Sequence, residues 1–177
     1  MHIVRQAGGS WREPATGAQH ADLLRHLRST VENLERPSDI TWSDRRDWFE
    51  DQITEHQGNG SYLLSEQACA LMMEVQTCYC AGAWIAVVVL AYTVIDAQLL
   101  ETQAPGFDGN SDQLLRHLDF SDEYQQLRLR RNRIVHLRCD QPAITVDLQW
   151  GSRKKPEAEA QAAVKLMLAA FFDAPGT

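Results

Sequence analysis

The stretch from Leu127 to Arg138, LRLRRNRIVHLR, combines residue types that could act on a phosphodiester. It holds five arginines, one asparagine and one histidine, and it contains no carboxylate. A guanidinium can bind a phosphate through two parallel hydrogen bonds, and an imidazole can accept or donate a proton near neutral pH. Because the whole chain has a formal net charge of -7, the segment predicts a local contact with an anion rather than a broadly basic surface.

The spacing of this segment predicts a helix with a charge on its apolar side. At about 100° per residue, Arg131 falls in the middle of an apolar arc, where a charge is costly without a partner. That arc consists of Tyr124, Leu127, Ile134 and Val135. His136 lies about 140° around the helix from Arg131, whereas Asn132 is stacked one turn before His136. Arg131 and His136 therefore converge only if the helix loosens near its end, or if two chains bring their motifs together across a two-fold axis.

A structural interpretation of the same residues stays open. Arginine-rich helix ends are common, because cations favour the negative C-terminal end of the helix dipole. A single histidine is more often structural than catalytic. The residues alone are thus consistent with a phosphate-binding site and with a solvated basic face.

The inner six residues, RNRIVH, resemble the motif of HEPN domains. In these helical domains an arginine, usually followed directly by a polar residue, precedes a histidine by a few positions, and Arg131 to His136 matches the shortest form. The stretch AGAWIAVVVLAYTVIDAQLL is similar to the second helix of many such domains, where apolar residues lead to an acidic residue near the end. The resemblance covers roughly residues 62–172 and implies a bundle of about four or five helices.

The resemblance also implies a chemistry, because the family's enzymes are metal-independent ribonucleases. RNA supplies its own nucleophile, the 2′-hydroxyl, so the protein needs a proton-transfer group and a cation for the phosphate. Arg131 would bind the phosphate and His136 would transfer a proton. Asn132 would contact the phosphate or orient His136, with the second role favoured. Asp96, at the acidic position of the second helix, would pair with Arg131 or His136; the alternative is a surface aspartate without a catalytic role.

The remaining arginines of the segment are interpreted as groups that position RNA phosphates, or as a solvated face. They are Arg128, Arg130, Arg133 and Arg138. Some toxin members of the family carry a tyrosine two residues after the histidine, which a partner enzyme modifies to silence them. This chain has Arg138 there, so silencing by that route is not expected, although another antitoxin or regulatory partner would fit a toxin or defence role.

We therefore expect an endoribonuclease of toxin or defence type that binds RNA and works as a homodimer. The competing hypothesis is a non-catalytic module that uses the same groove for dimerisation or for nucleotide or RNA binding. A metal-dependent nuclease is disfavoured, because no compact set of Asp and Glu ligands appears. The four cysteines show no zinc-binding or disulfide spacing. No metal and no other cofactor is expected, and buried reduced thiols would fit the cytoplasm.

The order of the predicted elements defines an all-α class with one short strand. Residues 1–60 are predicted to be an extension with two amphipathic helices, one over 20–36 and one starting after Ser43. Residues 61–173 are predicted to be the HEPN-like bundle, with helices near 61–79, 83–103, 111–118, 121–137 and from Pro156 onward. The alternation of AITVDLQW predicts a strand over 143–150. The apolar run at 81–95 is about fifteen residues long, which is short for a membrane span.

Overall fold

The computed structural model describes residues 36–136, 141–145 and 153–173, and all regular elements among them are helices. This confirms the all-α class. The helices are α2 (Asp39–Gln57), α3 (Glu66–Ala81), α4 (Trp84–Thr102), α5 (Ser111–His117), α6 (Asp122–Val135) and α8 (Lys154–Phe171). The helix expected over 20–36 and most of the strand expected over 143–150 lie outside the described residues, and 143–145 form no strand.

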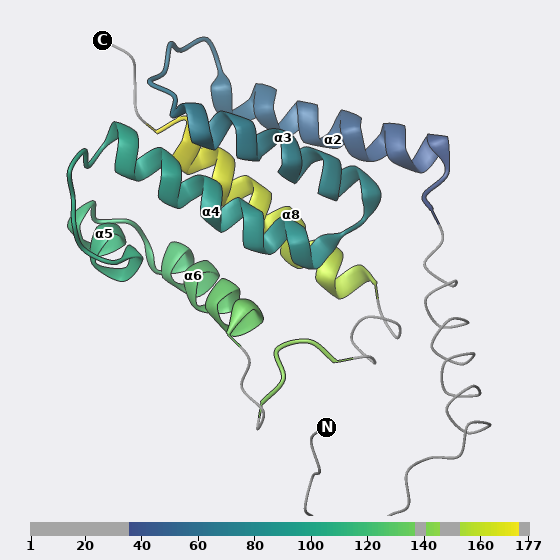
Figure 1. The fold of residues 1–177 in the computed structure, drawn as a ribbon. Coiled ribbons are helices and arrows are strands. Elements are labelled where there is room, and N and C mark those ends of the chain that lie inside the picture. The colour runs from purple at the N-terminus through teal and green to yellow at the C-terminus, as the bar shows by residue number, and fades with distance from the viewer. Residues whose placement is uncertain (1–35, 137–140, 146–152, 174–177) are drawn as a thin grey trace, which may run out of the picture. The chain divides into compact units, whose positions relative to one another are not determined.

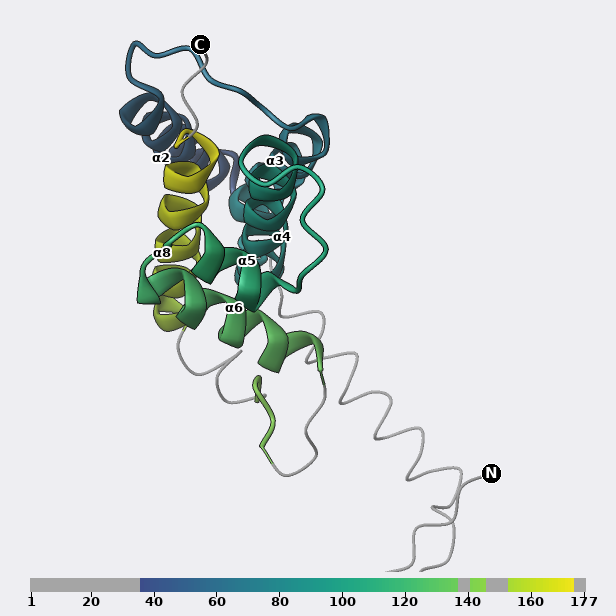
Figure 2. The same ribbon diagram turned by 90° about the vertical axis from the view of Figure 1, so that its left-hand side faces the viewer.

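Four of these helices pack around one core. Helix α4 lies between α3 and α8, and α2 contacts the same two neighbours from the other side (Figure 1). Helices α5 and α6 lie across α4 from α2, and α6 also touches α8 (Figure 2). The side of α4 that faces α5 and α6 is therefore the part of the bundle that can position the arginine-rich helix.

The turn between α3 and α4 explains why these helices are antiparallel neighbours. Gly82 ends α3 with φ 74° and ψ 24°, a left-handed conformation that glycine adopts at little cost. Its N–H donates to the carbonyl of Tyr79 at 3.0 Å, and Ala83 N donates to Cys78 O at 2.8 Å. The short break between the helices predicted near 61–79 and 83–103 is therefore this turn.

The first turns of two helices differ from the sequence expectation. Helix α2 starts after Ser38, whose hydroxyl accepts from Thr41 N at 3.1 Å, so the expected cap Ser43 lies inside the helix. Helix α3 is capped by Ser65, which accepts from Ala68 N at 3.0 Å, so it begins later than the start expected near residue 61. In both cases several serines precede the apolar pattern, and periodicity alone does not choose among them.

Helix α2 shares the core of the later helices. Phe49 is fully buried and packs against Tyr79 of α3, with ring centroids 5.8 Å apart. Trp48 stacks on the same Tyr79 ring at 4.7 Å. The expected division of the chain at residue 60 stays a prediction, and within the described residues α2 belongs to the same compact unit as α3 to α8.

Helix α4 is the central element of the bundle. It is the one helix of the described residues that is long and apolar enough to cross a membrane, which by itself is weak evidence. Ten of its residues are buried against the surrounding helices. Because it also carries Asp96 and the fully buried Gln98, both hydrogen-bonded to other elements, we treat it as a core helix.

Gln98 ties three parts of the bundle together. Its Oε1 accepts from Ser65 N at 2.9 Å, at the start of α3. Its Nε2 donates to Leu63 O at 2.8 Å and to Phe171 O at 3.2 Å, at the end of α8. The side chain thus satisfies backbone groups of the segment before α3 and the carbonyl of the last residue of α8, which has no intrahelical partner.

Candidate functional site

The arginine-rich helix ends at the histidine of the motif. Helix α6 starts after Ser121 and its last helical residue is Val135, so it ends two residues before the approximate end predicted at residue 137. His136 has an extended backbone, with φ -106° and ψ 105°, and its N–H donates to Asn132 O at 2.9 Å. Because the backbone leaves the helical path there, the direction of the imidazole does not follow the helical projection. The His136 side chain is exposed.

Arg131 is half-buried on the side of α6 that faces the bundle. Its Nη1 donates to the amide oxygen of Asn132 at 3.0 Å. Its Nε is buried and has no hydrogen-bond partner among the described residues. The predicted apolar arc holds for Tyr124 and Leu127, which are buried, but Val135 at the helix end is 44% exposed.

Asn132 therefore contacts Arg131 through its side chain and His136 only through its backbone. The 3.0 Å contact with Arg131 occupies the amide oxygen. The favoured role of Asn132 is to orient the imidazole of His136. In the described part of the chain, no hydrogen bond joins the side chains of these two residues. That role stays a prediction.

Asp96 lies on α4 where that helix meets α5 and α6. Its Oδ2 accepts from the Ser111 hydroxyl at 2.7 Å, and its Oδ1 is buried without a hydrogen-bond partner. Burial raises the pKa of this carboxyl, and the hydrogen bond from Ser111 and the positive charges of Arg131 and Arg128 partly oppose that rise. Arg131 thus acts on Asp96 electrostatically, although no ion pair joins them. The expected pairing of Asp96 with Arg131 or His136 stays a prediction. Buried carboxyl groups near specific cations are typical of functional sites.

Two residues that the sequence analysis did not select complete this cluster. Tyr92 lies one turn before Asp96 on α4 and is 1% exposed. Burial strongly raises the pKa of its hydroxyl, and Asp96 and Ser111 also affect that pKa. Tyr92 could have been found from its i−4 relation to an aspartate in an apolar helix. Ser111 gave no such signal, because it reaches Asp96 from a loop-connected element fifteen residues later.

The raised pKa of Asp96 makes stability depend on pH in a defined direction. The folded chain holds the Asp96 proton to higher pH than the unfolded chain, whose aspartates titrate near pH 4. The stability that this group contributes is therefore full below about pH 4 and is lost as pH rises through the raised pKa. We expect Asp96→Asn to gain stability relative to the unmodified chain as pH increases from about 4 to 7.

Thermal unfolding at several pH values measures this gain. Asp51→Asn, on the exposed side of α2, is the matched control. A difference between Asp96→Asn and the unmodified chain that stays constant across this pH range would contradict the assignment.

Arg128 connects α6 to α5. Its Nη2 donates to Asp112 Oδ1 at 2.8 Å, and its Nε donates to Gln125 Oε1 at 2.9 Å. The other oxygen of Asp112 accepts from Arg116 at 3.0 Å. One carboxylate of α5 is thus shared by two arginines, and it fixes α5 against α6.

Arg130 connects α6 to α8. It forms a bidentate ion pair with Glu159, through Nε at 2.5 Å and Nη2 at 3.1 Å, and it donates to Ala143 O at 2.9 Å. The segment 127–138 has no carboxylate of its own, but packing supplies Asp112 and Glu159 from other helices. Arg128 and Arg130 are therefore paired with acids, although the segment that carries them contains none.

The two remaining arginines of the predicted RNA-binding set differ from these. Arg133 is exposed, and its Nε makes only a long contact of 3.4 Å with Leu129 O. Arg138 lies outside the described residues. Arg133 is thus available to an anion in a way that Arg128 and Arg130 are not.

The contacts of Arg130 predict a structural effect for its removal. We expect Arg130→Ala to lower the free energy of unfolding by about 1–2 kcal/mol, since it removes charge-assisted bonds and leaves Glu159 unpaired. Arg133→Ala removes the same charge from an exposed position of α6, and we expect a change within about 0.5 kcal/mol. Urea denaturation measures both. Equal stabilities of the two variants would count against the structural role of Arg130.

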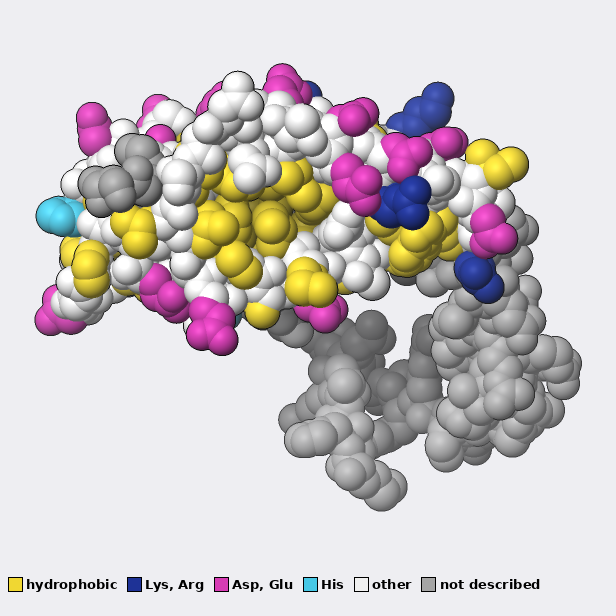
Figure 3. Space-filling view, turned by 90° about the horizontal axis from the view of Figure 1, so that it is seen from above, with side chains coloured by type: hydrophobic (Ala, Val, Ile, Leu, Met, Phe, Trp, Pro, Cys, Tyr) yellow, Lys and Arg dark blue, Asp and Glu magenta, His cyan; other side chains and the backbone are white. Residues whose placement is uncertain are grey.

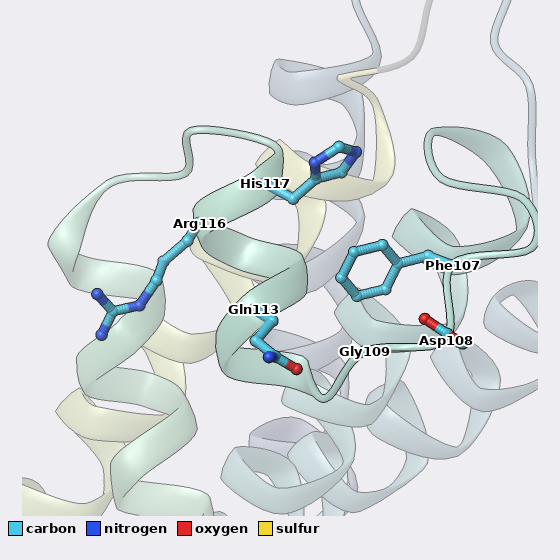
Figure 4. Close-up of a pocket in the computed structure, with 6 residues that line it drawn as sticks. All are labelled: Phe107, Asp108, Gly109, Gln113, Arg116 and His117. Carbon is cyan, nitrogen blue, oxygen red and sulfur yellow. The ribbon is translucent and has the colours of Figure 1, made fainter.

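A shallow pocket lies on α5 and the loop before it. Its cavity volume is about 620 Å³. Figure 4 shows Phe107, Asp108 and Gly109 coming from the loop and Gln113, Arg116 and His117 coming from α5. The Phe107 and His117 rings stack with centroids 5.3 Å apart. No residue predicted for the site lines this pocket.

The surface on the α2 and α3 side has a different character. Figure 3 shows apolar side chains gathered in the middle of that face, with acidic side chains around them and few basic ones. Met73 of α3 is 70% exposed. Helix α6 lies on the other side of the bundle (Figure 1).

Among the described residues, no group of three or more His, Cys, Asp or Glu side chains could hold a metal ion.

The comparisons with known proteins return no match. The resemblance to HEPN domains therefore rests on the residues of the sequence, and the site rests on the geometry described above. No protein-family model matches the chain, and neither the curated proteins nor the solved structures compared with it are similar to it.

Proposed function

We propose that the chain is a metal-independent endoribonuclease of the HEPN type. One observation carries the proposal: helix α6 presents a half-buried Arg131, whose charge acts on the half-buried Asp96 of α4, and it ends at an exposed His136. A cation fixed by packing and an accessible imidazole at the end of the same helix are the two groups that cleavage of RNA by its own 2′-hydroxyl requires.

In the proposed reaction the 2′-oxygen bonds to phosphorus and the bond from phosphorus to the 5′-oxygen breaks. A base takes the proton of the 2′-hydroxyl, and an acid gives a proton to the leaving 5′-oxygen. Arg131 binds the nonbridging oxygens, where charge accumulates. His136 performs one of the two proton transfers, and the matching histidine of a second copy performs the other. The products are a 2′,3′-cyclic phosphate and a 5′-hydroxyl.

The homodimer is part of the proposal, because one chain offers only one histidine in this segment. A dimer that places two α6 ends at one cleft gives two imidazoles and two guanidiniums around one phosphodiester. Sedimentation at micromolar concentration should then give twice the 20.0 kDa chain mass. A cytoplasmic location and a toxin or defence role, with a regulatory partner, fit such an activity.

The experiment that tests the proposal is cleavage of a mixed-sequence RNA by the purified chain in excess EDTA. We expect cleavage to persist in the chelator and to leave 2′,3′-cyclic phosphate ends. Cleavage that needs a divalent ion, or that leaves 3′-hydroxyl ends, would contradict the mechanism.

A second candidate function is a non-catalytic module that binds RNA or nucleotides, or that dimerises, through the same surface. The observation that favours it is the pairing of Arg128 and Arg130 with Asp112 and Glu159, which leaves fewer free cations for a substrate. In the same experiment this function would appear as RNA retention on a filter without any cleavage.

A further inference from the structure

We propose that Tyr92 and Ser111 are positioning residues of this site: they hold the Asp96 carboxyl on the side of α4 that faces Arg131. The inference rests on the proposed function for its catalytic consequence, but its structural part can be tested without cleavage. Neither residue touches a substrate in this scheme. Both act through Asp96.

The first support is the contact from Ser111. Its hydroxyl donates to Asp96 Oδ2 at 2.7 Å, so one carboxylate oxygen is fixed from α5. Fixing Oδ2 also fixes the direction of Oδ1, because the two oxygens share one plane. Asp96 Oδ1 is buried and has no hydrogen-bond partner in the described part of the chain.

The second support comes from three buried polar atoms on α4 and α6. The hydroxyl of Tyr92, the Nε of Arg131 and Asp96 Oδ1 are all buried without a hydrogen-bond partner among the described residues. Two of them donate and one accepts, so their requirements match. Asp96 and Ser111 both act on the pKa of the Tyr92 hydroxyl, and Tyr92 in turn lowers the pKa of Asp96, although the hydroxyl makes no hydrogen bond of normal geometry with either residue.

An unpartnered buried polar group is expensive, and the Tyr92 hydroxyl and the Arg131 charge both act on the pKa of Asp96. The neighbouring charges indicate which cation Asp96 can orient. Arg131 and Arg128 reach Asp96 from α6, and Asp112 of α5 is already paired with Arg128. Arg131, whose Nε has no partner, is therefore the cation that a correctly held Asp96 can orient.

The test compares conservative variants that each remove one hydroxyl. Tyr92→Phe removes only the phenolic oxygen, and Ser111→Ala removes the donor to Oδ2. Tyr79→Phe is the matched control, because Tyr79 is equally buried but its hydroxyl accepts from Gln161 Nε2 at 3.1 Å, away from the cluster. Ser111→Thr restores a hydroxyl and should recover the unmodified behaviour.

The structural readout is the titration of the Asp96 carboxyl, followed by NMR of the full chain. Because the Ser111 and Tyr92 hydroxyls both lower the Asp96 pKa, we expect it to rise in Ser111→Ala and, by less, in Tyr92→Phe. We expect no change in Tyr79→Phe. Slower solvent exchange of the Arg131 Nε proton in the unmodified chain than in Tyr92→Phe should accompany the shift.

The catalytic readout is the pH profile of RNA cleavage. If ionised Asp96 orients Arg131, kcat/KM increases with pH as Asp96 loses its proton. In Ser111→Ala and Tyr92→Phe this increase should move to higher pH, and the rate at neutral pH should fall by roughly tenfold. An unchanged Asp96 titration in both variants would overturn the inference. Absence of cleavage by the unmodified chain, with the titration shifts present, would instead reject the proposed function and leave the positioning role standing.

Discussion

Substitution of His136 by alanine is expected to slow RNA cleavage by about 100-fold or more, which is the usual contribution of a positioned proton-transfer group. The residue is exposed and follows the last helical residue of α6, so its removal should leave the fold intact. Single-turnover cleavage of RNA in EDTA measures the loss. Because the imidazole acts in the chemical step, the fall should appear in kcat more than in KM.

The matched control for this variant is His117→Ala. His117 is also exposed and lies at the end of α5, where it stacks on Phe107 and lines the shallow pocket. We expect it to keep nearly full activity. Equal activities of His136→Ala and the unmodified chain would exclude the ribonuclease mechanism proposed for this motif.

Replacement of Gln98 is expected to have the largest effect on stability, about 2–4 kcal/mol. The side chain is fully buried, and its loss leaves the Ser65 N–H and the carbonyls of Leu63 and Phe171 without these bonds. Gln98→Leu should be about as destabilising as Gln98→Ala, because filling the space does not replace the hydrogen bonds. Chemical denaturation with an unchanged m-value measures the loss.

The control for Gln98 is Gln67→Ala on the exposed side of α3, which should change stability by less than about 0.5 kcal/mol. If Gln98→Leu instead proves as stable as the unmodified chain, the role of the amide is packing rather than bonding. The stability of α8 is the more specific reporter, because Gln98 holds the carbonyl of Phe171 at its end. Hydrogen exchange in the last turn of α8 should increase in both Gln98 variants.

Local pattern was sufficient to predict most helices. The apolar repeats gave α2, α3, α4, α6 and α8 within a few residues, because a period near 3.6 is a property of the helix itself. The same period placed Arg131 on the inward side of α6, where it is half-buried. It also marked Asp96 as a carboxyl inside an apolar helix, and burial does raise its pKa.

Helix ends were less well predicted. Val135 fits the apolar arc of α6 but is 44% exposed, because it is the last helical residue. Ser38 rather than Ser43 caps α2. The positions of helix ends depend on which residues are packed against other helices, and the repeat of apolar residues does not predict this.

The sequence by itself determined the all-α class of the described residues, a charged residue on the inner side of a late helix and an acid inside the most apolar helix. Only the tertiary structure decided which groups meet them. Asp112 reaches Arg128 and Glu159 reaches Arg130 from positions sixteen and twenty-nine residues away. Such pairings depend on how helices cross, whereas sequence spacing reports neighbours only within about one helical turn.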